Sequence, residues 1–226
     1  MIKSLVHAFF PEVCLACKRL LYEKEEYLCL HCLHTLPRTD YFKRKENELF
    51  LRLANRIPIQ SAQALFYFNK KSYSQQLVHA IKYSAYNTRA YWFGKLMGEA
   101  WKMNHDWIPD VVVPVPLHPK RQKERGYNQS EALVRGYAET IGVEVCIDAL
   151  VRKEHKDSQT KKGKSGRWED ALSAYGSKEF NLEGKKILLV DDIITTGATI
   201  EACGQLLANM KLAELHIYSL SVAITL

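Results

Sequence analysis

The feature that most constrains the fold is a set of apolar runs that alternate with segments of helical periodicity. Near-continuous apolar runs occur in AQALFYF, DVVVPVP, VEVCIDALVR, KKILLVDDI and ELHIYSLSVAI. Segments with apolar residues at helical spacing lie among them: YSQQLVHAIKY, RAYWFGKLMGEAWKM, NQSEALVRGYAETIG and ATIEACGQLLANMK. Strands that are apolar throughout are expected when helices cover both faces of a sheet. The sequence therefore predicts an α/β fold with a mostly parallel central sheet flanked by helices.

Length and composition narrow the class of protein. The chain has 226 residues, of which 47% are hydrophobic, enough for one ordinary domain with an appendage and too many for a disordered chain. The net charge of +7 suits phosphorylated substrates or nucleic acid, and equally a solvated Lys-rich surface. No apolar run is long enough to cross a bilayer. The opening MIKSLVHAFFP is interpreted as a short packed helix, not a signal peptide, so we expect a cytoplasmic protein.

Four cysteines near the start form a C-x2-C-x11-C-x2-C pattern: Cys14, Cys17, Cys29 and Cys32. Each pair can direct two thiolates at one point, and four sulfurs suit tetrahedral Zn²⁺. Disulfides are disfavoured in the expected compartment, a redox pair would not need a second copy, and iron–sulfur clusters usually show other spacings. We therefore predict a zinc-ribbon-like module with a structural Zn²⁺ over residues 1–40. A role of its basic residues in contacting nucleic acid is a weaker alternative.

Three polar loops follow predicted strands and should meet at one edge of the sheet. They are PVPLHPKRQKERGYNQ, RKEHKDSQTKKGKSGRW and DDIITTGAT. In open parallel sheets, ligands bind beyond the carboxyl ends of the strands. The second loop has seven Lys or Arg among seventeen residues, which is typical of a mobile lid over an anion but also of a loop that binds nothing.

The third loop places two acids before a glycine–hydroxyl segment that enters a helix. Adjacent buried carboxylates need hydroxyls, a metal or cations to face, here at Asp191 and Asp192. A helix N-terminus offers free backbone N–H groups to an anion, and a glycine lets the backbone turn closely around it. A ligand with hydroxyls at one end and a phosphate at the other, such as a sugar phosphate, fits this pattern. A P-loop would end in Gly-Lys-Ser/Thr, and no lysine follows Gly197, so the segment is not a P-loop. An ordinary helix N-cap explains one Asp or one Thr but not the whole segment.

The segment ILLVDDIITTGAT closely resembles the phosphoribosyl pyrophosphate (PRPP) signature of type I phosphoribosyltransferases. With the four-cysteine start and VVPVPLHPKRQKERGYNQSEAL, the whole chain resembles the ComF family, of the ComFC/GntX type. The resemblance implies that Asp191 and Asp192 hold the ribose hydroxyls. It also implies that the next loop cradles the 5-phosphate through Thr195, Thr196, Gly197, Ala198 and Thr199.

The resemblance assigns roles to the other two loops as well. The pyrophosphate loop would comprise Pro116, Leu117, His118 and Pro119, and the flexible loop would contribute Arg152, Gln159 and Arg167. The family pattern continues from that arginine to an Asn three residues later, where this chain has Asp170. In the hallmark RGYNQ, Asn128 is as suited to capping the next helix as to contacting a ligand.

The resemblance further implies a glycosyltransferase that uses PRPP with Mg²⁺, in which Asp191, Asp192 and Arg167 carry the catalytic contacts. It divides the chain into the zinc module (1–40), a linker and hood-like region (41–105) and a phosphoribosyltransferase-like core (106–226). The sequence shows no convincing acceptor pocket in the hood-like region. Activity therefore stays open between phosphoribosyl transfer to an unknown acceptor and PRPP sensing or single-stranded DNA binding without turnover. The resemblance points to DNA uptake in natural competence, with other competence proteins as candidate partners.

Overall fold

The computed structural model describes residues 12–69, 72–82, 87–153, 174–178 and 180–223. Its central sheet has five strands in the order β1-β7-β6-β2-β3, and all four pairings between neighbours are parallel. The strands are β1 Ser61–Phe68, β2 Val111–Pro114, β3 Glu144–Val145, β6 Lys186–Ile194 and β7 Glu214–Ala223. The predicted α/β fold with a mostly parallel sheet is confirmed.

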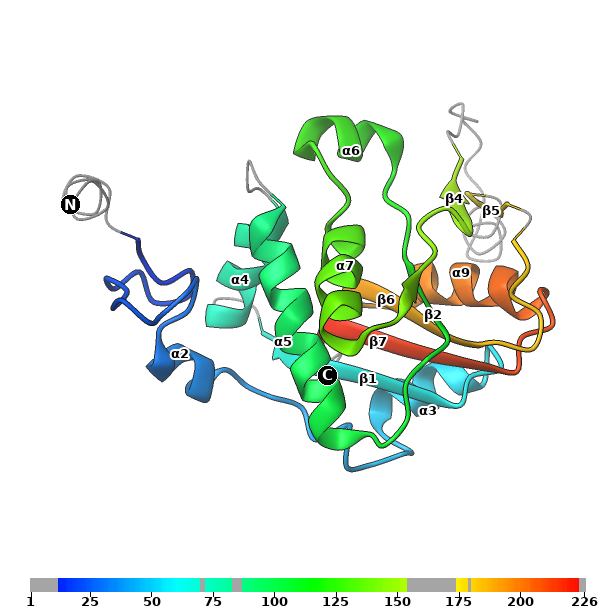
Figure 1. Ribbon diagram of the computed structural model, residues 1–226, viewed down its shortest axis with the longest axis horizontal. Helices are drawn as coiled ribbons and strands as arrows, with labels where there is room; N and C mark the ends of the chain where they lie inside the picture. Colours follow the sequence, from blue (N-terminus) through cyan, green and yellow to red (C-terminus); the bar gives the residue numbers. More distant parts are fainter. Residues whose placement is uncertain (1–11, 70–71, 83–86, 154–173, 179, 224–226) are drawn as a thin grey trace.

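Helices lie on both sides of this sheet (Figure 1). They are α2 Leu30–Thr35, α3 Glu48–Ala54, α4 Tyr73–Lys82, α5 Thr88–Asn104, α6 Pro119–Arg125, α7 Gln129–Ile141 and α9 Ala198–Ala208. A separate antiparallel pair, β4 Leu150–Arg152 and β5 Tyr175–Ser177, lies near α9 (Figure 1). The run VEVCIDALVR, predicted as one strand, is therefore divided between β3 and β4.

One face of the sheet packs against α4, α5 and α7. Leu188 and Val190 of β6 point to this side, as alternate residues of a strand must. Helices α5 and α7 approach closely through two glycines. A Cβ on Gly94 would lie 2.0 Å from the Leu133 carbonyl oxygen, and a Cβ on Gly136 would lie 2.0 Å from that of Tyr91. Any side chain at these positions would push the helices apart and move α7 away from the sheet.

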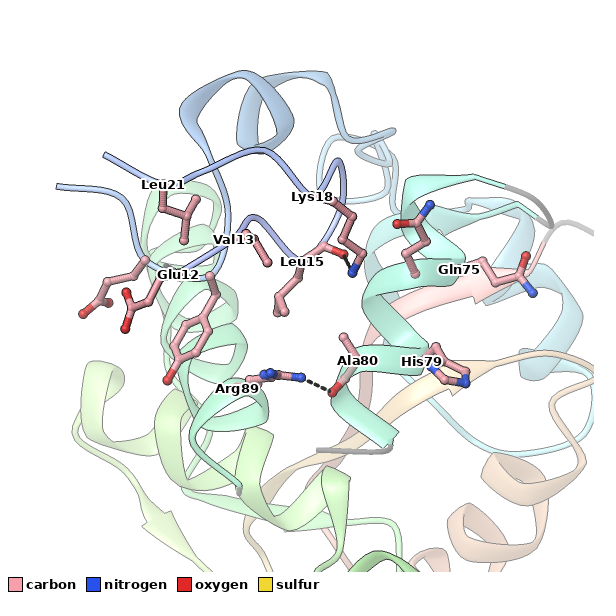
Figure 2. Close-up of a pocket in the computed structure, with 12 residues that line it drawn as sticks. Glu12, Val13, Leu15, Lys18, Leu21, Gln75, His79, Ala80 and Arg89 are labelled. Atoms are coloured by element: carbon pink, nitrogen blue, oxygen red, sulfur yellow. Dashed lines mark hydrogen bonds between the residues drawn. The ribbon is translucent and has the colours of Figure 1, made fainter. Parts of the chain in front are cut away.

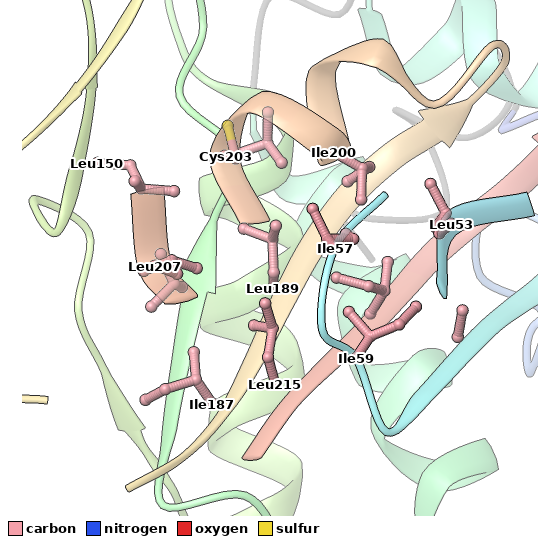
Figure 3. Close-up of a cluster of buried hydrophobic side chains, with 14 of the residues drawn as sticks. Leu53, Ile57, Ile59, Leu150, Ile187, Leu189, Ile200, Cys203, Leu207 and Leu215 are labelled. Carbon is pink, nitrogen blue, oxygen red and sulfur yellow. The ribbon is translucent and has the colours of Figure 1, made fainter. Parts of the chain in front are cut away.

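The other face packs against α3 and α9 (Figure 3). Ile187 and Leu189 of β6 meet Cys203 and Leu207 of α9, while Leu53 reaches the same cluster from α3 (Figure 3). The polar segment before β1, in the predicted linker and hood-like region, contains the helix α3. Its apolar side is fully buried in the core, because two leucines one turn apart face the sheet. This part of the chain is thus a core element as well as a connection.

The four-cysteine segment packs against the α4–α5 side of the domain. Its buried side chains belong to the same apolar cluster as those of α4 and α5, and the rings of Tyr27 and Trp92 meet edge to face at 5.8 Å. The helix expected at the very start of the chain lies outside the described residues. Within the described ranges, no helix has the length and apolar character to span a membrane.

Candidate functional site

Two adjacent acids lie buried near the carboxyl end of β6. Asp191 and Asp192 are 8% and 9% exposed. The strand continues past them to Ile194, because its last residues still pair with β7. Ser130, in the first turn of α7, donates its hydroxyl to Asp191 Oδ1 at 2.9 Å, and the Asp192 backbone N–H donates to the same oxygen at 2.9 Å.

The electrostatics of the acid pair are unfavourable for two negative charges. Burial raises the pKa of Asp191 to about 7, with further raising by the neighbouring Asp192 carboxylate and partial relief from the Ser130 hydroxyl. The Lys82 ammonium, at the end of α4, lies 3.2 Å from Asp192 Oδ2. That buried oxygen accepts no hydrogen bond from the described residues, so the lysine contact is an ion pair without hydrogen-bond geometry. The pair is therefore only partly compensated.

The glycine–hydroxyl loop follows directly and leads into α9. Gly197 caps the helix with φ of 87°, a conformation that suits glycine, and a Cβ there would also lie 3.0 Å from Leu53. Thr195 and Thr196 are exposed. Arg52 of α3 donates to the Thr195 carbonyl oxygen at 2.8 Å and holds the loop from below. The Ala198 N–H donates to the Thr196 hydroxyl at 3.4 Å, and Gly197 supplies no side-chain cap, so the other N–H groups of the first α9 turn can face an anion.

The hallmark segment RGYNQ with the following serine ties the site together. Asn128 caps α7 by accepting from Ser130 N at 3.1 Å, and its amide donates to the Val115 carbonyl at 3.0 Å. The capping interpretation of Asn128 is confirmed, and its second bond reaches the start of the predicted pyrophosphate loop. Tyr127 donates its hydroxyl to the Ile81 carbonyl, one residue before Lys82. This segment therefore connects α4, the loop after β2 and Asp191.

The predicted pyrophosphate loop, residues 116–119, is half-buried and leads into α6. His118 caps that helix by accepting from Lys120 N at 3.1 Å, and Pro119 occupies its first turn. No side chain of α6 is buried. Its exposed basic residues follow the loop at once: Lys120, Arg121 and Lys123.

The flexible loop is described only at its base. Gln159, Arg167 and Asp170 lie outside the described residues. Arg152 is the last residue of β4 and donates to the Tyr175 hydroxyl across the small hairpin. Tyr175 has a raised pKa because it is buried, and its hydroxyl lies beside Thr199. The hairpin thus places Arg152 near the N-terminal turn of α9.

The four predicted metal ligands come together. The ligand atoms of Cys14, Cys17, Cys29 and Cys32 all lie within 4.8 Å of one another, and all four are unpaired thiols. The Sγ atoms of Cys17 and Cys29 are 3.7 Å apart. A tetrahedron with metal–sulfur bonds of about 2.3 Å has edges of about 3.8 Å, so this geometry fits Zn²⁺. The cluster can therefore hold a metal ion.

One large cavity lies away from the acid pair. It measures about 1040 Å³ and lies between the four-cysteine segment and α4–α5 (Figure 2). Leu15, Tyr27 and Arg89 are among the residues that line it, and Arg89 donates to the Ala80 carbonyl at 3.3 Å. The buried carboxylates and the helix N-terminus are groups that can bind a polar ligand, whereas the volume of this cavity does not indicate what it would bind. We place the candidate site at the carboxyl edge of the sheet for that reason.

Sequence reasoning missed three contributors to the site. Lys82, Ser130 and Arg52 come from three different helices and contact the acid pair or the loop after it. Ser130 follows the RGYNQ hallmark directly, which was a usable signal. The lysine and the arginine had none, since the chain contains 32 Lys and Arg residues.

Comparison with known proteins identifies the relatives. The phosphoribosyl transferase domain family matches residues 127–221, which include the acid pair and its loop. Competence protein F of Haemophilus influenzae is 29% identical over 119 residues, 51% of this chain and 52% of that protein. Competence protein ComFC of Streptococcus pneumoniae is 38% identical over 108 residues, 48% of this chain and 46% of that protein. The chain is therefore similar, over about half of its length, to competence proteins of the ComF and ComFC type, and its C-terminal part matches the phosphoribosyl transferase domain family.

These matches cover only part of each relative. DNA utilization protein YhgH of Escherichia coli K12 is 28% identical over 113 residues, 50% of this chain and 49% of that protein. The aligned part thus spans about half the length of these curated relatives. Among solved structures, PRPP amidotransferase from B. subtilis superposes with a TM-score of 0.45 and 19% identity, over 63% of this chain and 30% of the other.

Proposed function

We propose that this protein binds PRPP at the carboxyl edge of its sheet and acts in the uptake or processing of DNA. The observation that carries the proposal is the partly compensated acid pair of β6 placed directly before the free N-terminus of α9. The printed names of the relatives, competence proteins and DNA utilization proteins, support the cellular role.

The two halves of the site match the two ends of a ribose 5-phosphate group. Carboxylates accept hydrogen bonds only, so Asp191 and Asp192 would take both hydroxyls of a ribose diol as donors. The backbone N–H groups and hydroxyls from Thr195 to Thr199 would receive the 5-phosphate. Burial of the acids strengthens this preference, because a poorly hydrated carboxylate gains more from each hydroxyl that donates to it.

Pyrophosphate and Mg²⁺ would lie over the loop of residues 116–119. The described residues outside the cysteine cluster form no group of three His, Cys, Asp or Glu side chains that could hold an ion. This suits Mg²⁺, which commonly reaches such sites through substrate phosphates and keeps several waters. It would shield the charge of the departing pyrophosphate. The exposed cations of α6 would add positive charge beside it.

The division of the chain remains part of this proposal. Residues 106–226 would form the PRPP-binding core, and residues 41–105 would lie where related enzymes bind their acceptor. Arg167 would contact the ligand from the flexible loop. Transfer would need an acceptor held at the ribose C1, and positioning would supply most of the rate. The alternative is PRPP binding without turnover.

We also infer that the cysteine cluster holds a structural Zn²⁺. A closed shell of four sulfurs leaves no open position for substrate. The buried apolar side chains of the segment, Leu15, Ala16, Leu28 and Leu36, pack against α4 and α5 and form no separate core, so the metal would hold the segment in the shape that makes this contact.

Calorimetry of PRPP with Mg²⁺ tests the site. The double variant Asp191→Asn with Asp192→Asn should lose about 100-fold or more in affinity, because the amide nitrogens present donors to hydroxyl donors. Asp148→Asn removes a carboxylate from an exposed ion pair with Lys178 and should leave affinity unchanged. Equal affinities for the double variant and wild type would refute the site. Pyrophosphate release with candidate bases then separates transfer from binding.

Single-stranded DNA binding is a second candidate, favoured by the exposed Lys120, Arg121 and Lys123 of helix α6. Affinity for an oligonucleotide should fall steeply with salt. Lys120→Ala with Lys123→Ala should flatten the logarithmic salt slope by about 1–2, whereas Lys95→Ala with Lys178→Ala changes the net charge equally at other places. Identical slopes for the two double variants would exclude α6 as the contact.

A further inference from the structure

Lys82 is the cation recorded within ion-pair distance of the acid pair among the described residues. We propose that Lys82 is a positioning residue that favours the ionised form of the Asp191–Asp192 pair near neutral pH, the form that can accept a ribose diol. This inference rests on the proposed function and names the group that prepares the proposed site. Its evidence is the 3.2 Å separation of Lys82 Nζ from Asp192 Oδ2, with both side chains largely buried.

The position of Lys82 is fixed by its neighbours. It is the last residue of α4, and the two carbonyls before it are both engaged. Arg89 of α5 donates to the Ala80 carbonyl (Figure 2), and Tyr127 donates to the Ile81 carbonyl. The end of α4 is therefore held from two sides. The backbone of Lys82 is thereby fixed opposite the acid pair, so only its side-chain rotamers remain to be ordered in the contact.

The pair needs such a cation because its other neighbours are weak partners. The groups that face it are the Ser130 hydroxyl from α7, the Tyr127 phenol, the Tyr175 phenol from β5 and the Cys203 thiol from α9. Each is neutral at pH 7, and the two phenols and the thiol have pKa values raised by burial. Arg152 lies farther away, beside Tyr175 and within electrostatic range of Cys203. Lys82 therefore supplies the nearest positive charge.

The balance is close to a switching point. Burial and the mutual repulsion of the acids raise the pKa of Asp191 to about 7, even with Lys82 lowering it. Without the lysine the pair would retain a proton at neutral pH. A proton on the pair turns one acceptor into a donor and removes it from the ligand diol. The loss of PRPP affinity should then be recovered by raising the pH.

This pH signature separates the counter-ion role from two others. If the lysine contacted the ligand phosphate directly, its removal would lower PRPP affinity at every pH. A lysine that blocked the site would, when removed, leave affinity higher than in wild type. Only charge compensation predicts a loss at low pH that disappears at high pH.

The experiment uses the full chain and three variants. Lys82→Met keeps most of the side-chain length without the charge, Lys82→Arg keeps the charge, and Lys95→Met removes a lysine from an exposed ion pair on α5. Carboxyl carbon NMR of the ligand-free protein reports the titration midpoint of the pair. Lys82→Met should raise this midpoint by about one unit or more, while Lys82→Arg and Lys95→Met stay near wild type.

Calorimetry with PRPP and Mg²⁺ completes the test, with each variant compared with wild type at the same pH. Lys82→Met should lose about tenfold in affinity at pH 6.5 and approach wild type at pH 8.5. An unchanged midpoint, or an equal loss at both pH values, would overturn the counter-ion role. If Lys82→Met raises the midpoint but wild type binds no PRPP, the proposed function is refuted and the effect of Lys82 on the ionisation of the pair still stands.

Discussion

The two edges of the central sheet each bury a polar cluster, and the clusters differ in how completely they are satisfied. At the carboxyl edge, Asp191 and Asp192 share a few donors and one lysine, and a buried carboxylate oxygen has no hydrogen-bond partner among the described residues. At the amino edge, the imidazole of His216 has a partner on each nitrogen. The comparison separates polar groups that hold the fold from polar groups that await a ligand.

The amino-edge cluster is closed. His216, only 5% exposed, bonds Ser61 Oγ through Nδ1 at 2.7 Å and Glu214 Oε2 through Nε2 at 3.0 Å. Lys186 lies 3.6 Å from the same glutamate, and the Trp107 ring covers the imidazole at 4.4 Å between centroids. Each polar side chain of this cluster has a partner within the protein, so the cluster can stabilise the fold without a ligand.

Opposite pH responses follow from this contrast. Burial lowers the pKa of His216, so the amino edge loses stability as the pH falls below the usual histidine value. Burial raises the pKa of Asp191 to about 7, so the carboxyl edge loses stability as the pH rises from the usual aspartate value to about 7, and the loss levels off above that pH. The amino edge is most stable with His216 neutral. The carboxyl edge holds an unfavourable negative charge at neutral pH, which a ligand can relieve.

The largest effect is expected from Asp191→Asn. The folded pKa of this carboxyl is about 7 and the unfolded value about 4, so its ionisation costs the folded state on the order of 2–4 kcal/mol as the pH rises through that window. The variant has no charge to lose. Its free energy of unfolding should therefore fall less than that of wild type between pH 5 and 8, measured by urea denaturation.

Asp148→Asn is the matched control, because this acid is exposed and pairs with Lys178 at the surface. It should follow wild type across the whole pH range. If Asp191→Asn also follows wild type, the carboxyl edge stores no unfavourable charge and the contrast between the two edges fails.

A smaller effect is expected from His216→Ala. The substitution leaves a cavity beside Trp107 and removes a partner from both Ser61 and Glu214, at a cost of about 2–3 kcal/mol. The affinity for PRPP should stay within twofold of wild type, because the cluster lies at the far edge of the sheet. Urea denaturation at pH 8 and calorimetry measure the two quantities.

The exposed His34 of α2 gives the control: His34→Ala should change neither quantity. A large loss of PRPP affinity in a folded His216→Ala protein would show that the amino edge takes part in binding. The division between a structural edge and a binding edge would then be wrong.

The fold and the main features of the site were predictable from the sequence because they depend on local patterns. Apolar runs predict buried parallel strands, and the spacing of four cysteines predicts a common ligand point, as the cluster confirms. The place of the acids after an apolar run predicts a buried pair. Each of these inferences needs only residues that are close in sequence.

The remaining parts depend on contacts between distant segments. Ser130 lies 61 residues from the aspartate that it contacts, and Lys82 reaches the pair from a different helix. The amino-edge cluster joins residues 155 positions apart, so no local pattern announces it. Helix α3 is an exception, because the spacing of Leu49 and Leu53 by one helical turn indicates a buried helix face despite the polar residues around them.

The smallest effect is expected from Ser61→Ala, which tests an arrangement that looks catalytic. Serine, histidine and glutamate in hydrogen-bonded sequence resemble the activated serine of a hydrolase. Ser61 is only 9% exposed within β1, so its hydroxyl is largely closed to a substrate. If the Ser61 hydroxyl is structural, Ser61→Ala should lower the free energy of unfolding by about 1 kcal/mol, since one buried hydrogen bond is removed while His216 keeps its bond to Glu214.

Urea denaturation of Ser61→Ala, with the exposed Ser177→Ala as control, measures this loss. A fluorophosphonate probe that labels wild type and not Ser61→Ala would show a reactive serine, and the amino edge would then be a second site and not a closed support for the first.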